Sequence, residues 1–411
     1  MTARKVLFLV LDGIADRPCR ELGGKTPLQA ATTSNLDRIA AEGVCGIMDT
    51  IAPGIRPGSD TAHLALLGYP PRDYYTGRGP LEAEGCGIHM EPGMIGFRAN
   101  FATLDPEHRV IDRRAGRIHE TRDLSAAIEK GVDLSAFGVE FRFVSGAGHR
   151  AALALKGEGL GSYVSSNDPK KEGASPLTIV PTTDRSEDKK TADACNEFIR
   201  QSTKILFDHT LNKKRLSAGQ NPANVVLIRG AGEMGKFEPF PERYELTGSV
   251  ISAATLITGI GKVVGLEYIP VTGATGSTDS DLPAKIAAAI RELDRKDFVL
   301  VNIKGADEAG HDGHAKEKAA FIEKIDAAVA PLLEREDCLL AICADHSTPC
   351  SLKDHSADPV PVVIHGDGVR VDRVTAFDEI SCAEGGLSRL HGCDLMPILL
   401  DLIDKAHKYG A

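Results

Sequence analysis

Short apolar runs recur along the chain and alternate with amphipathic stretches. Five runs are rich in β-branched residues and are bounded by polar, Gly or Pro residues: Val6–Leu11, Val225–Ile228, Phe298–Ile303, Leu339–Cys343 and Val360–Ile364. Continuous apolar runs of this length are typical of strands that are covered on both faces of a sheet. We therefore predict five buried strands.

Helical patterns lie between these runs. Ser34 is placed to cap a helix that ends at Gly43, and Lys316–Leu333 and Leu395–His407 have apolar residues at helical spacing. Strands that alternate with helices predict an α/β fold with a doubly wound, mostly parallel sheet.

The middle of the chain has a different pattern. Short predicted strands follow one another there without a crossover helix between each pair: Phe101–Leu104, Arg117–Glu120, Phe141–Val144 and Ala151–Leu155. We expect a smaller α+β domain at 97–220, inserted into a core domain formed by 1–96 and 221–411.

A long polar passage, Ser165–Lys190, lies within the predicted insertion. It precedes a predicted helix near Ala192–His209 and a predicted loop at Asn212–Asn224. The passage is too long for a plain connector, so a lid, a substrate loop and disorder all remain open for it.

Composition changes this picture little. The 411 residues carry a net charge of −10, with 26% charged and 42% hydrophobic residues, which is typical of a globular protein. The acidic balance argues against nonspecific nucleic-acid binding, because that needs a basic face. Taken over the whole chain, it also fits an anionic substrate poorly.

Cysteine usage and the first apolar run bear on the compartment. The nine cysteines include no C-x-x-C pair, so we expect free thiols in a reducing cytosol. Val6–Leu11 is too short for a signal-peptide core or a membrane span. The sequence therefore predicts a cytoplasmic protein with no membrane or nucleic-acid partner, and it leaves a homo-oligomer open.

Two glycine-rich motifs resemble nucleotide-binding motifs but lack the neighbouring residues that such sites need. Gly230–Gly235 matches the dinucleotide-binding pattern, but Pro239 and Pro241 follow too closely for the helix that such a site needs. Thr272–Asp281 lacks the Gly-Lys-Ser/Thr ending of a phosphate-binding loop. Both are predicted to be turns.

Potential metal ligands follow three of the predicted strands. They are Asp12, Asp307, His311, Asp345, His346 and His355. Open α/β sheets place their ligands at the carboxyl ends of strands, so these side chains are expected at one edge. Mixed Asp and His sets suit Mn²⁺, Zn²⁺ or Co²⁺ better than Ca²⁺ or Mg²⁺.

Each of these residues taken alone would be a helix cap or a surface residue. Six together are too many for a single tetrahedral site with an open position, so two metal ions are the natural inference. His314, beside this set, is expected to be solvated.

Ser59 lies where a loop leads into a predicted helix. One interpretation is that it only caps the helix, and the segment alone favours that. The other is that a metal-bound serine at a helix N-terminus ionises to a nucleophile. A serine activated in this way needs no base, so His63 is given no catalytic role.

Motifs over nearly the whole chain resemble the alkaline phosphatase superfamily, and more closely the archaeal-type cofactor-independent phosphoglycerate mutases. They are Leu11–Gly13, Thr26–Ala30, Asn35–Asp37, Arg56–His63, Gly77–Ala83, Gly148–Ala152, Lys304–Gly313, Ala344–Pro349 and Asp354–Pro361. The Ser59 segment and the two C-terminal motifs are the specific signals among them.

The resemblance implies a division of the ligands. One metal ion would bind Asp307, His311 and His355, and the second would bind Asp12, Ser59, Asp345 and His346. Two divalent cations are implied, with Mn²⁺ as the first choice and Zn²⁺, Co²⁺ or Mg²⁺ as alternatives, and no 2,3-bisphosphoglycerate.

Candidate substrate groups also follow from the resemblance. His149, Arg150, Arg229 and Lys304 are the best matches for residues that hold phosphate and carboxylate. A solvated surface charge is the alternative for each basic residue. Asp16 and Asp168 are guesses for the acidic group that moves protons.

The implied activity is interconversion of 2- and 3-phosphoglycerate through a phosphoserine on Ser59, in an isomerase whose inserted domain closes over the substrate. A metal-dependent phosphatase or phosphotransferase for another small ester, such as homoserine phosphate, is the alternative enzyme. A binding protein with a relic metal site is a third hypothesis, but intact ligands at all seven positions argue against it.

The site hypothesis also accounts for the acidic net charge. Asp12, Asp307 and Asp345 would hold cations that reverse the local sign where an anionic substrate binds.

Overall fold

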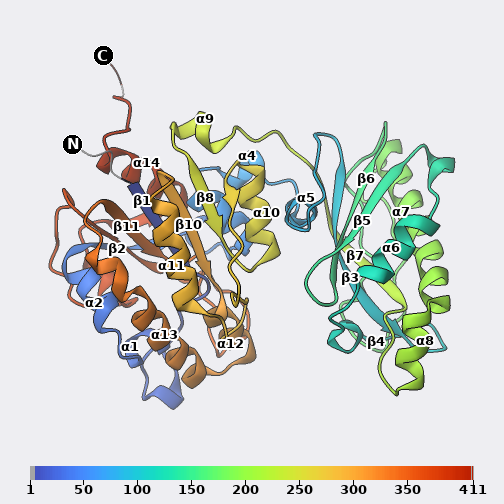
Figure 1. Ribbon diagram of the computed structural model, residues 1–411, viewed down its shortest axis with the longest axis horizontal. Coiled ribbons are helices and arrows are strands. Elements are labelled where there is room, and N and C mark those ends of the chain that lie inside the picture. Colours follow the sequence, from blue (N-terminus) through green and yellow to red (C-terminus); the bar gives the residue numbers. More distant parts are fainter. Residues whose placement is uncertain (1–4, 409, 411) are drawn as a thin grey trace. The chain divides into compact units, whose positions relative to one another are not determined.

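The computed structural model describes residues 5–408 and 410 and contains two compact units. The core unit comprises Met1–Tyr75 and Phe237–Ala411, and the inserted unit comprises Thr76–Lys236 (Figure 1). The inserted unit is wider than the expected 97–220 segment, and α5 (Arg78–Gly85) packs against three strands of its sheet.

The core unit is built on an eight-stranded sheet. In spatial order its strands are β13 (Ser388–His391), β2 (Gly43–Asp49), β12 (Val360–His365), β11 (Cys338–Cys343), β1 (Lys5–Leu11), β10 (Phe298–Ile303), β8 (Gly248–Ile251) and β9 (Glu267–Tyr268). Neighbouring strands run parallel, except that β12 is antiparallel to both β11 and β2. The predicted α/β fold with a mostly parallel sheet is confirmed.

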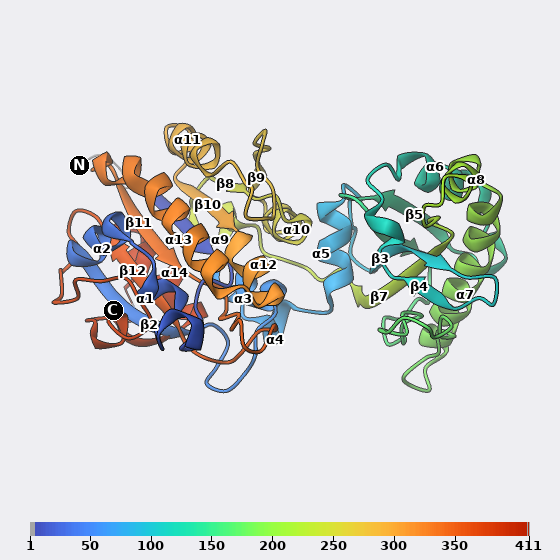
Figure 2. The same ribbon diagram turned by 90° about the horizontal axis from the view of Figure 1, so that it is seen from below.

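Helices cover both faces of this sheet. On one face α13 (Ala315–Val329) packs against α2 (Ser34–Ala41) and α11 (Leu282–Leu293), as Figure 2 shows. The other face carries α3 (Ser59–Leu66), which packs against α10 (Thr255–Val263) and α14 (Gly392–Leu402). Shorter helices complete the unit: α1 (Pro27–Ala30), α4 (Pro71–Tyr74), α9 (Phe240–Tyr244) and α12 (Gly305–Asp312).

The start of α2 differs from the prediction. Thr33 is its N-cap residue and Ser34 its first residue, and neither side chain caps the helix. The free backbone N–H groups of Asn35 and Leu36 donate instead to Asp326 Oδ1 of α13, at 2.9 and 2.8 Å. A carboxylate that is distant in sequence thus does the capping, and local spacing could not reveal it.

An antiparallel sheet forms the inserted unit. The central strand β3 (Ile95–Leu104) pairs with β4 (Val110–Asp112), β6 (Arg150–Lys156) and β7 (Val225–Glu233), and β5 (Glu140–Ser145) pairs with β6. Its helices are α5, α6 (Arg122–Gly131), α7 (Ser186–Asp208) and α8 (Thr210–Ser217).

The prediction that Val225–Ile228 belongs to the core sheet is therefore wrong. Val226 and Ile228 pack into one apolar cluster and Val225 and Leu227 into another, on the opposite face of the strand. A strand covered on both faces has the same sequence pattern in a parallel and in an antiparallel sheet, so the run alone could not separate them.

Other expectations about the inserted unit need correction. Arg117–Glu120 is not a strand, because a 3-10 helix over Ala115–Arg117 precedes irregular chain there. The predicted loop at Asn212–Asn224 overlaps most of α8, which begins at Thr210 and whose first turn is capped by His209.

The polar passage Ser165–Lys190 is irregular until α7 begins. Asn167 fixes it to β7, because its side chain donates to Val226 O and accepts from Ile228 N at 3.0 and 2.6 Å.

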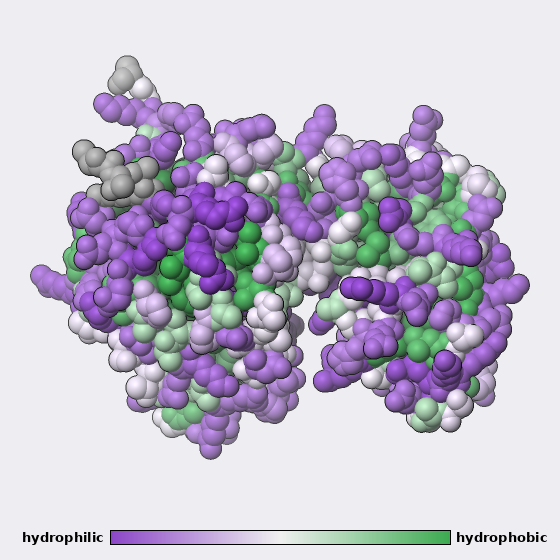
Figure 3. Space-filling model, viewed as in Figure 1, coloured by the Kyte–Doolittle hydropathy of each residue, from purple (hydrophilic) through white to green (hydrophobic). Residues whose placement is uncertain are grey.

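Neither excluded motif begins a helix. The prediction of a turn is wrong for the first motif, because strand β7 continues through Gly230–Glu233. It is confirmed for Thr272–Asp281, which consists of turns, bends and irregular chain. None of the nine cysteines, all of which lie within the described residues, forms a disulfide. Within residues 5–408 and 410, no helix combines the length and apolar character that crossing a membrane requires. The face seen in Figure 3 is mostly hydrophilic on both units.

Candidate active site

The candidate ligands lie where three adjacent parallel strands end. Asp12 follows β1, Asp345 and His346 follow β11, and α12 after β10 carries Asp307 and His311. Since β1 pairs with both β10 and β11, their carboxyl ends meet at one edge of the sheet. The loop that leads from β11 to β12 brings His355 to the same edge.

Asp307, His311 and His355 form one group, with candidate ligand atoms within 4.8 Å of one another. Asp307 Oδ1 lies 3.3 Å from His311 Nε2 and 3.6 Å from His355 Nε2. Both imidazoles donate from Nδ1 to backbone carbonyls, at 3.0 Å to Lys353 O and 2.9 Å to Pro57 O. With Nδ1 engaged as a donor, Nε2 is the nitrogen that can bind a metal ion once it has lost its proton.

Asp12, Asp345 and His346 form a second group that meets the same 4.8 Å limit. His346 Nε2 lies 3.7 Å from Asp12 Oδ1, 3.2 Å from Asp345 Oδ2 and 3.1 Å from the hydroxyl oxygen of Ser59. The rings of His346 and His355 stack with centroids 3.5 Å apart, so the two groups adjoin. The structure thus brings together all seven residues that the sequence pointed to.

A buried atom without a partner indicates that a cation fits the second group. Asp345 Oδ1 accepts hydrogen bonds from the backbone N–H groups of Gly13 and His346, both at 3.1 Å. Asp345 Oδ2 is buried and accepts none. Because a buried carboxylate oxygen without a donor is costly, the donor set of this group suits a divalent metal ion.

Charges within the cluster shift its pKa values in opposite directions. Burial raises the pKa of Asp12, and the neighbouring Asp345 carboxylate adds to the rise. Burial alone would also raise the pKa of Asp345, but the adjacent His346 imidazole and other cations outweigh it and lower that pKa. The hydrogen bond with Asp307 raises the pKa of His311 to about 9. Three packed carboxylates therefore depend on nearby positive charge.

Ser59 is the first residue of α3, and Gly58 is its N-cap, so the prediction that the Ser59 side chain caps the helix is wrong. Its side chain turns to His346 instead. His63, one turn on, is fully buried and contacts the Ser59 carbonyl oxygen through Nδ1 at 2.8 Å. That contact supports the backbone of the turn rather than the hydroxyl.

Lys304 is the one candidate substrate residue in the core unit. Its ammonium group lies 3.0 Å from Asp12 Oδ1 and 2.6 Å from Asp307 Oδ2, between the two ligand groups. Burial would lower the pKa of Lys304, but these carboxylates raise it above its usual value. Lys304 is therefore a fixed positive charge between the two ligand groups.

The other candidate substrate residues lie in the inserted unit. Arg229 pairs in register with Arg98, and Arg150 pairs with Asn100 two residues further along β3. Alternation along a strand puts Arg98 and Asn100 on one face of the sheet. Arg98 was not predicted. The signal that could have found it is a charged residue between two apolar residues, Phe97 and Ala99, which are buried in the structure.

One donor on this basic face of the inserted unit makes no hydrogen bond. The Nε atom of Arg98 is buried, and the Glu82 carboxylate lies 3.6 Å from it. Burial, together with the charge of Arg229 and other arginines, lowers the pKa of Arg98 to about 10. Burial and the adjacent Arg150 lower the pKa of His149 to about 4. The arrangement suits an anion.

The two guesses for a proton-transfer group have different surroundings. Asp16 accepts from Lys318 at 2.9 Å in a pair with no exposed side-chain surface. Asp168 accepts from Arg229 at 2.6 Å and from Arg113 at 2.7 Å. Burial would raise the pKa of Asp168, but its hydrogen bonds with Arg113 and other donors lower it. Asp168 therefore lies among the candidate substrate residues, whereas Asp16 is committed to Lys318.

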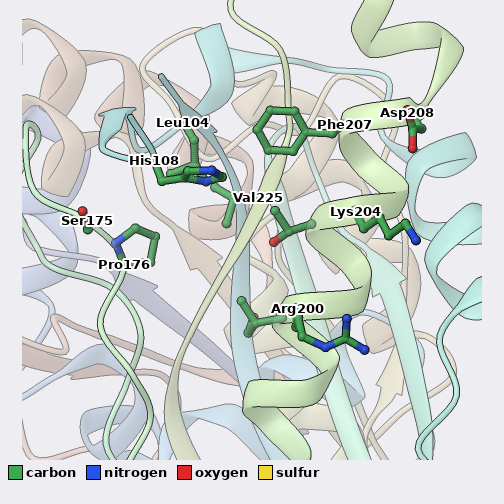
Figure 4. Close-up of a pocket in the computed structure, with 11 residues that line it drawn as sticks. Leu104, His108, Ser175, Pro176, Arg200, Lys204, Phe207, Asp208 and Val225 are labelled. Atoms are coloured by element: carbon green, nitrogen blue, oxygen red, sulfur yellow. The ribbon is translucent and has the colours of Figure 1, made fainter. Parts of the chain in front are cut away.

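A separate hollow of about 570 Å³ lies between α7 and the β3–β4 connection of the inserted unit (Figure 4). Its lining is mostly apolar, with the rings of His108 and Phe207 at 6.1 Å. Arg200 and Lys204 reach its edge from α7. None of the predicted site residues lines it.

Comparisons with known proteins agree with this geometry. Residues 40–212 match the family model of 2,3-bisphosphoglycerate-independent phosphoglycerate mutase. A Methanosphaerula palustris protein of that name is 70% identical, and the alignment covers 100% of both chains.

Two solved structures are also similar. A Pyrococcus horikoshii protein has a TM-score of 0.87 at 34% identity, with all of both chains covered. The cofactor-independent phosphoglycerate mutase of Thermoplasma acidophilum has a TM-score of 0.71 at 36% identity, covering 97% of this chain and 100% of the other. The resemblance noted in the sequence is confirmed. The chain belongs to the family of 2,3-bisphosphoglycerate-independent phosphoglycerate mutases, which are isomerases.

Proposed function

We propose that this protein interconverts 2- and 3-phosphoglycerate through a phosphoserine on Ser59. The observation that carries the proposal is the position of the Ser59 hydroxyl, 3.1 Å from His346 Nε2 and beside buried carboxylates. It begins a helix, whose N-terminal N–H groups favour a phosphoryl group. Family membership supports phosphoglycerate as the substrate.

Two divalent cations complete the proposed site, with Mn²⁺ as the first choice. Asp307, His311 and His355 would hold one, and Asp12, Ser59, Asp345 and His346 would hold the other. When bound, such ions lower the pKa of a coordinated hydroxyl and neutralise phosphoryl oxygens.

Residues of the chain have separate roles in the phosphoryl transfer. Ser59 Oγ attacks phosphorus, and the bond between phosphorus and the substrate oxygen breaks as the new bond forms. Lys304 supplies positive charge to the phosphoryl oxygens. The reverse transfer returns the phosphoryl group to the other hydroxyl of glycerate and frees Ser59.

We propose that the inserted unit supplies groups that hold the substrate carboxylate and phosphate. The candidates are Arg98, His149, Arg150 and Arg229. The support for the three arginines is their register on one sheet face and an Arg98 Nε that makes no hydrogen bond. The support for His149 is its position next to Arg150. Asp168, which contacts Arg229, is the better candidate for moving protons between the hydroxyls of glycerate.

The test is a metal-reconstitution assay with 3-phosphoglycerate and no 2,3-bisphosphoglycerate. We expect 2-phosphoglycerate to form with Mn²⁺, without release of phosphate. Ser59→Ala should abolish the reaction. Ser34→Ala, at the exposed first position of α2, is the matched control and should leave it intact. Phosphate release without isomerisation would favour the alternative, a phosphatase for a small phosphate ester.

A further inference from the structure

Thr348 is a fully buried side chain between the two ligand groups. Its hydroxyl lies 2.7 Å from Asp307 Oδ1, in the first group, and 3.0 Å from His346 Nδ1, in the second. The hydroxyl thus joins a carboxylate of one group to an imidazole of the other.

Counting protons fixes the direction of these two contacts. An ionised carboxylate only accepts, so the single hydroxyl proton of Thr348 is donated to Asp307. The hydroxyl oxygen then has only lone pairs for His346, so His346 Nδ1 must be the donor. With Nδ1 held as the donor, Nε2 is the nitrogen that remains to bind a cation, on the side of Ser59 and Asp345.

The other two imidazoles have no such dependence on a side chain. His311 and His355 donate from Nδ1 to the backbone carbonyls of Lys353 and Pro57. Those acceptors are set by the fold and remain after any substitution. For His346, the acceptor is a hydroxyl whose orientation depends on Asp307.

The fold also fixes the backbone of Thr348. Its N–H donates to Ala15 O at 3.1 Å, and its carbonyl accepts from the buried ammonium of Lys318 at 2.9 Å. A methyl group at Gly310 would lie 2.5 Å from the Thr348 carbonyl oxygen and 2.9 Å from its γ-methyl carbon, so the chain fits closely around this residue.

We propose that Thr348 is a positioning residue that sets the tautomer of His346 and couples it to Asp307. Through this hydroxyl, a change at Asp307 in the first group alters the hydrogen bond that orients His346 in the second. The inference rests on the proposed two-cation function. Partners of this kind orient metal-binding histidines, and losing one typically costs 10–100-fold in metal affinity.

The test compares Thr348→Val with Thr348→Ser in the full chain. Valine keeps the shape but removes the hydroxyl, and serine retains it. Calorimetry with Mn²⁺ alone should give two binding events for the wild type and for T348S. In T348V, one event should weaken about 10–100-fold. The kcat of T348V should fall at limiting Mn²⁺ with KM for 3-phosphoglycerate unchanged, and excess Mn²⁺ should restore it.

A spectroscopic measurement separates positioning from a general loss of structure. In protein loaded with diamagnetic Zn²⁺, the His346 Nδ1–H should give a slowly exchanging NMR signal in the wild type and in T348S. T348V should lose that signal while its far-UV circular dichroism is unchanged. Wild-type Mn²⁺ affinity at both sites, or a retained signal, in T348V would overturn the inference.

The result also distinguishes this inference from the proposed function. Uptake of two Mn²⁺ with the expected T348V defect, but no isomerisation, would refute the mutase proposal and support the role of Thr348. Failure of the wild type to bind two metal ions would overturn both.

Discussion

Lys285 is a buried ammonium group that forms no ion pair with a carboxylate of the described residues. It lies on α11 with 1% of its surface exposed, and its ammonium donates to the carbonyl oxygen of Asn302 at 3.0 Å. Burial lowers the pKa of Lys285 from 10.5 to about 8, and the Asp12 carboxylate opposes part of the shift. We predict that Lys285→Met stabilises the protein at neutral pH.

The magnitude follows from the pKa difference between the folded and unfolded chain. A fall from 10.5 to about 8 corresponds to about 3 kcal/mol of destabilisation wherever both states are protonated, that is below pH 8. Leaving the Asn302 carbonyl without its donor costs about 1 kcal/mol. The variant should therefore be about 2 kcal/mol more stable than the wild type at pH 7.

Burial of the Lys285 ammonium group also predicts how the stability of the wild type changes with pH. Between pH 8 and 10.5 the unfolded chain holds the Lys285 proton and the folded chain releases it, so wild-type stability rises with pH through this group. The advantage of Lys285→Met should therefore shrink across that window and reverse near pH 10.5.

Urea denaturation at pH 7 and 10.5 measures this, followed by far-UV circular dichroism because the chain has no tryptophan. The matched control is Lys316→Met, since Lys316 is exposed on α13 and its charge stays hydrated on folding. A stability difference between K285M and wild type that is the same at both pH values would refute the reasoning.

Three further predictions concern the site and its surroundings. Gly13→Ala should lower Mn²⁺ uptake and activity at least tenfold, because the added methyl would lie 2.6 Å from Asp307 Cβ. Gly23 has a similar positive φ but open space around it, so Gly23→Ala should lower the free energy of unfolding by only about 1 kcal/mol, measured by thermal denaturation. Because burial lowers the pKa of His149 to about 4, wild-type stability should fall as pH drops from 6.5 to 4, and His149→Gln should remove up to about 2 kcal/mol of that loss in urea titrations. Asp345→Asn should lose about one equivalent of bound Mn²⁺ by elemental analysis, and unchanged metal content would contradict its assignment as a ligand.

Much of the metal cluster could be predicted because its residues follow strands that the sequence marks clearly. The strands before Asp12, Asp307 and Asp345 are mostly apolar runs in the centre of the core sheet, with Asn302 as the one polar residue near a carboxyl end. Parallel neighbours must end at the same edge, which places these carboxylates together without knowledge of side-chain contacts.

The remaining errors arise where tertiary contacts decide. Asp326 caps α2 from a distant helix, and no local pattern signals that. The Ser59 side chain turns to His346 because Gly58 already occupies the cap position. The roles of Thr348 and Arg98 depend on partners that meet only in the folded chain.

The most direct test of the central claim is to look for phosphate on Ser59. The Mn²⁺-loaded protein would be mixed with 3-phosphoglycerate, quenched during turnover, and its peptides mapped by mass spectrometry. We predict one phosphate on the peptide that contains Ser59, absent from Ser59→Ala and present in Ser34→Ala. Formation of 2-phosphoglycerate with no phosphate on Ser59 would contradict the account.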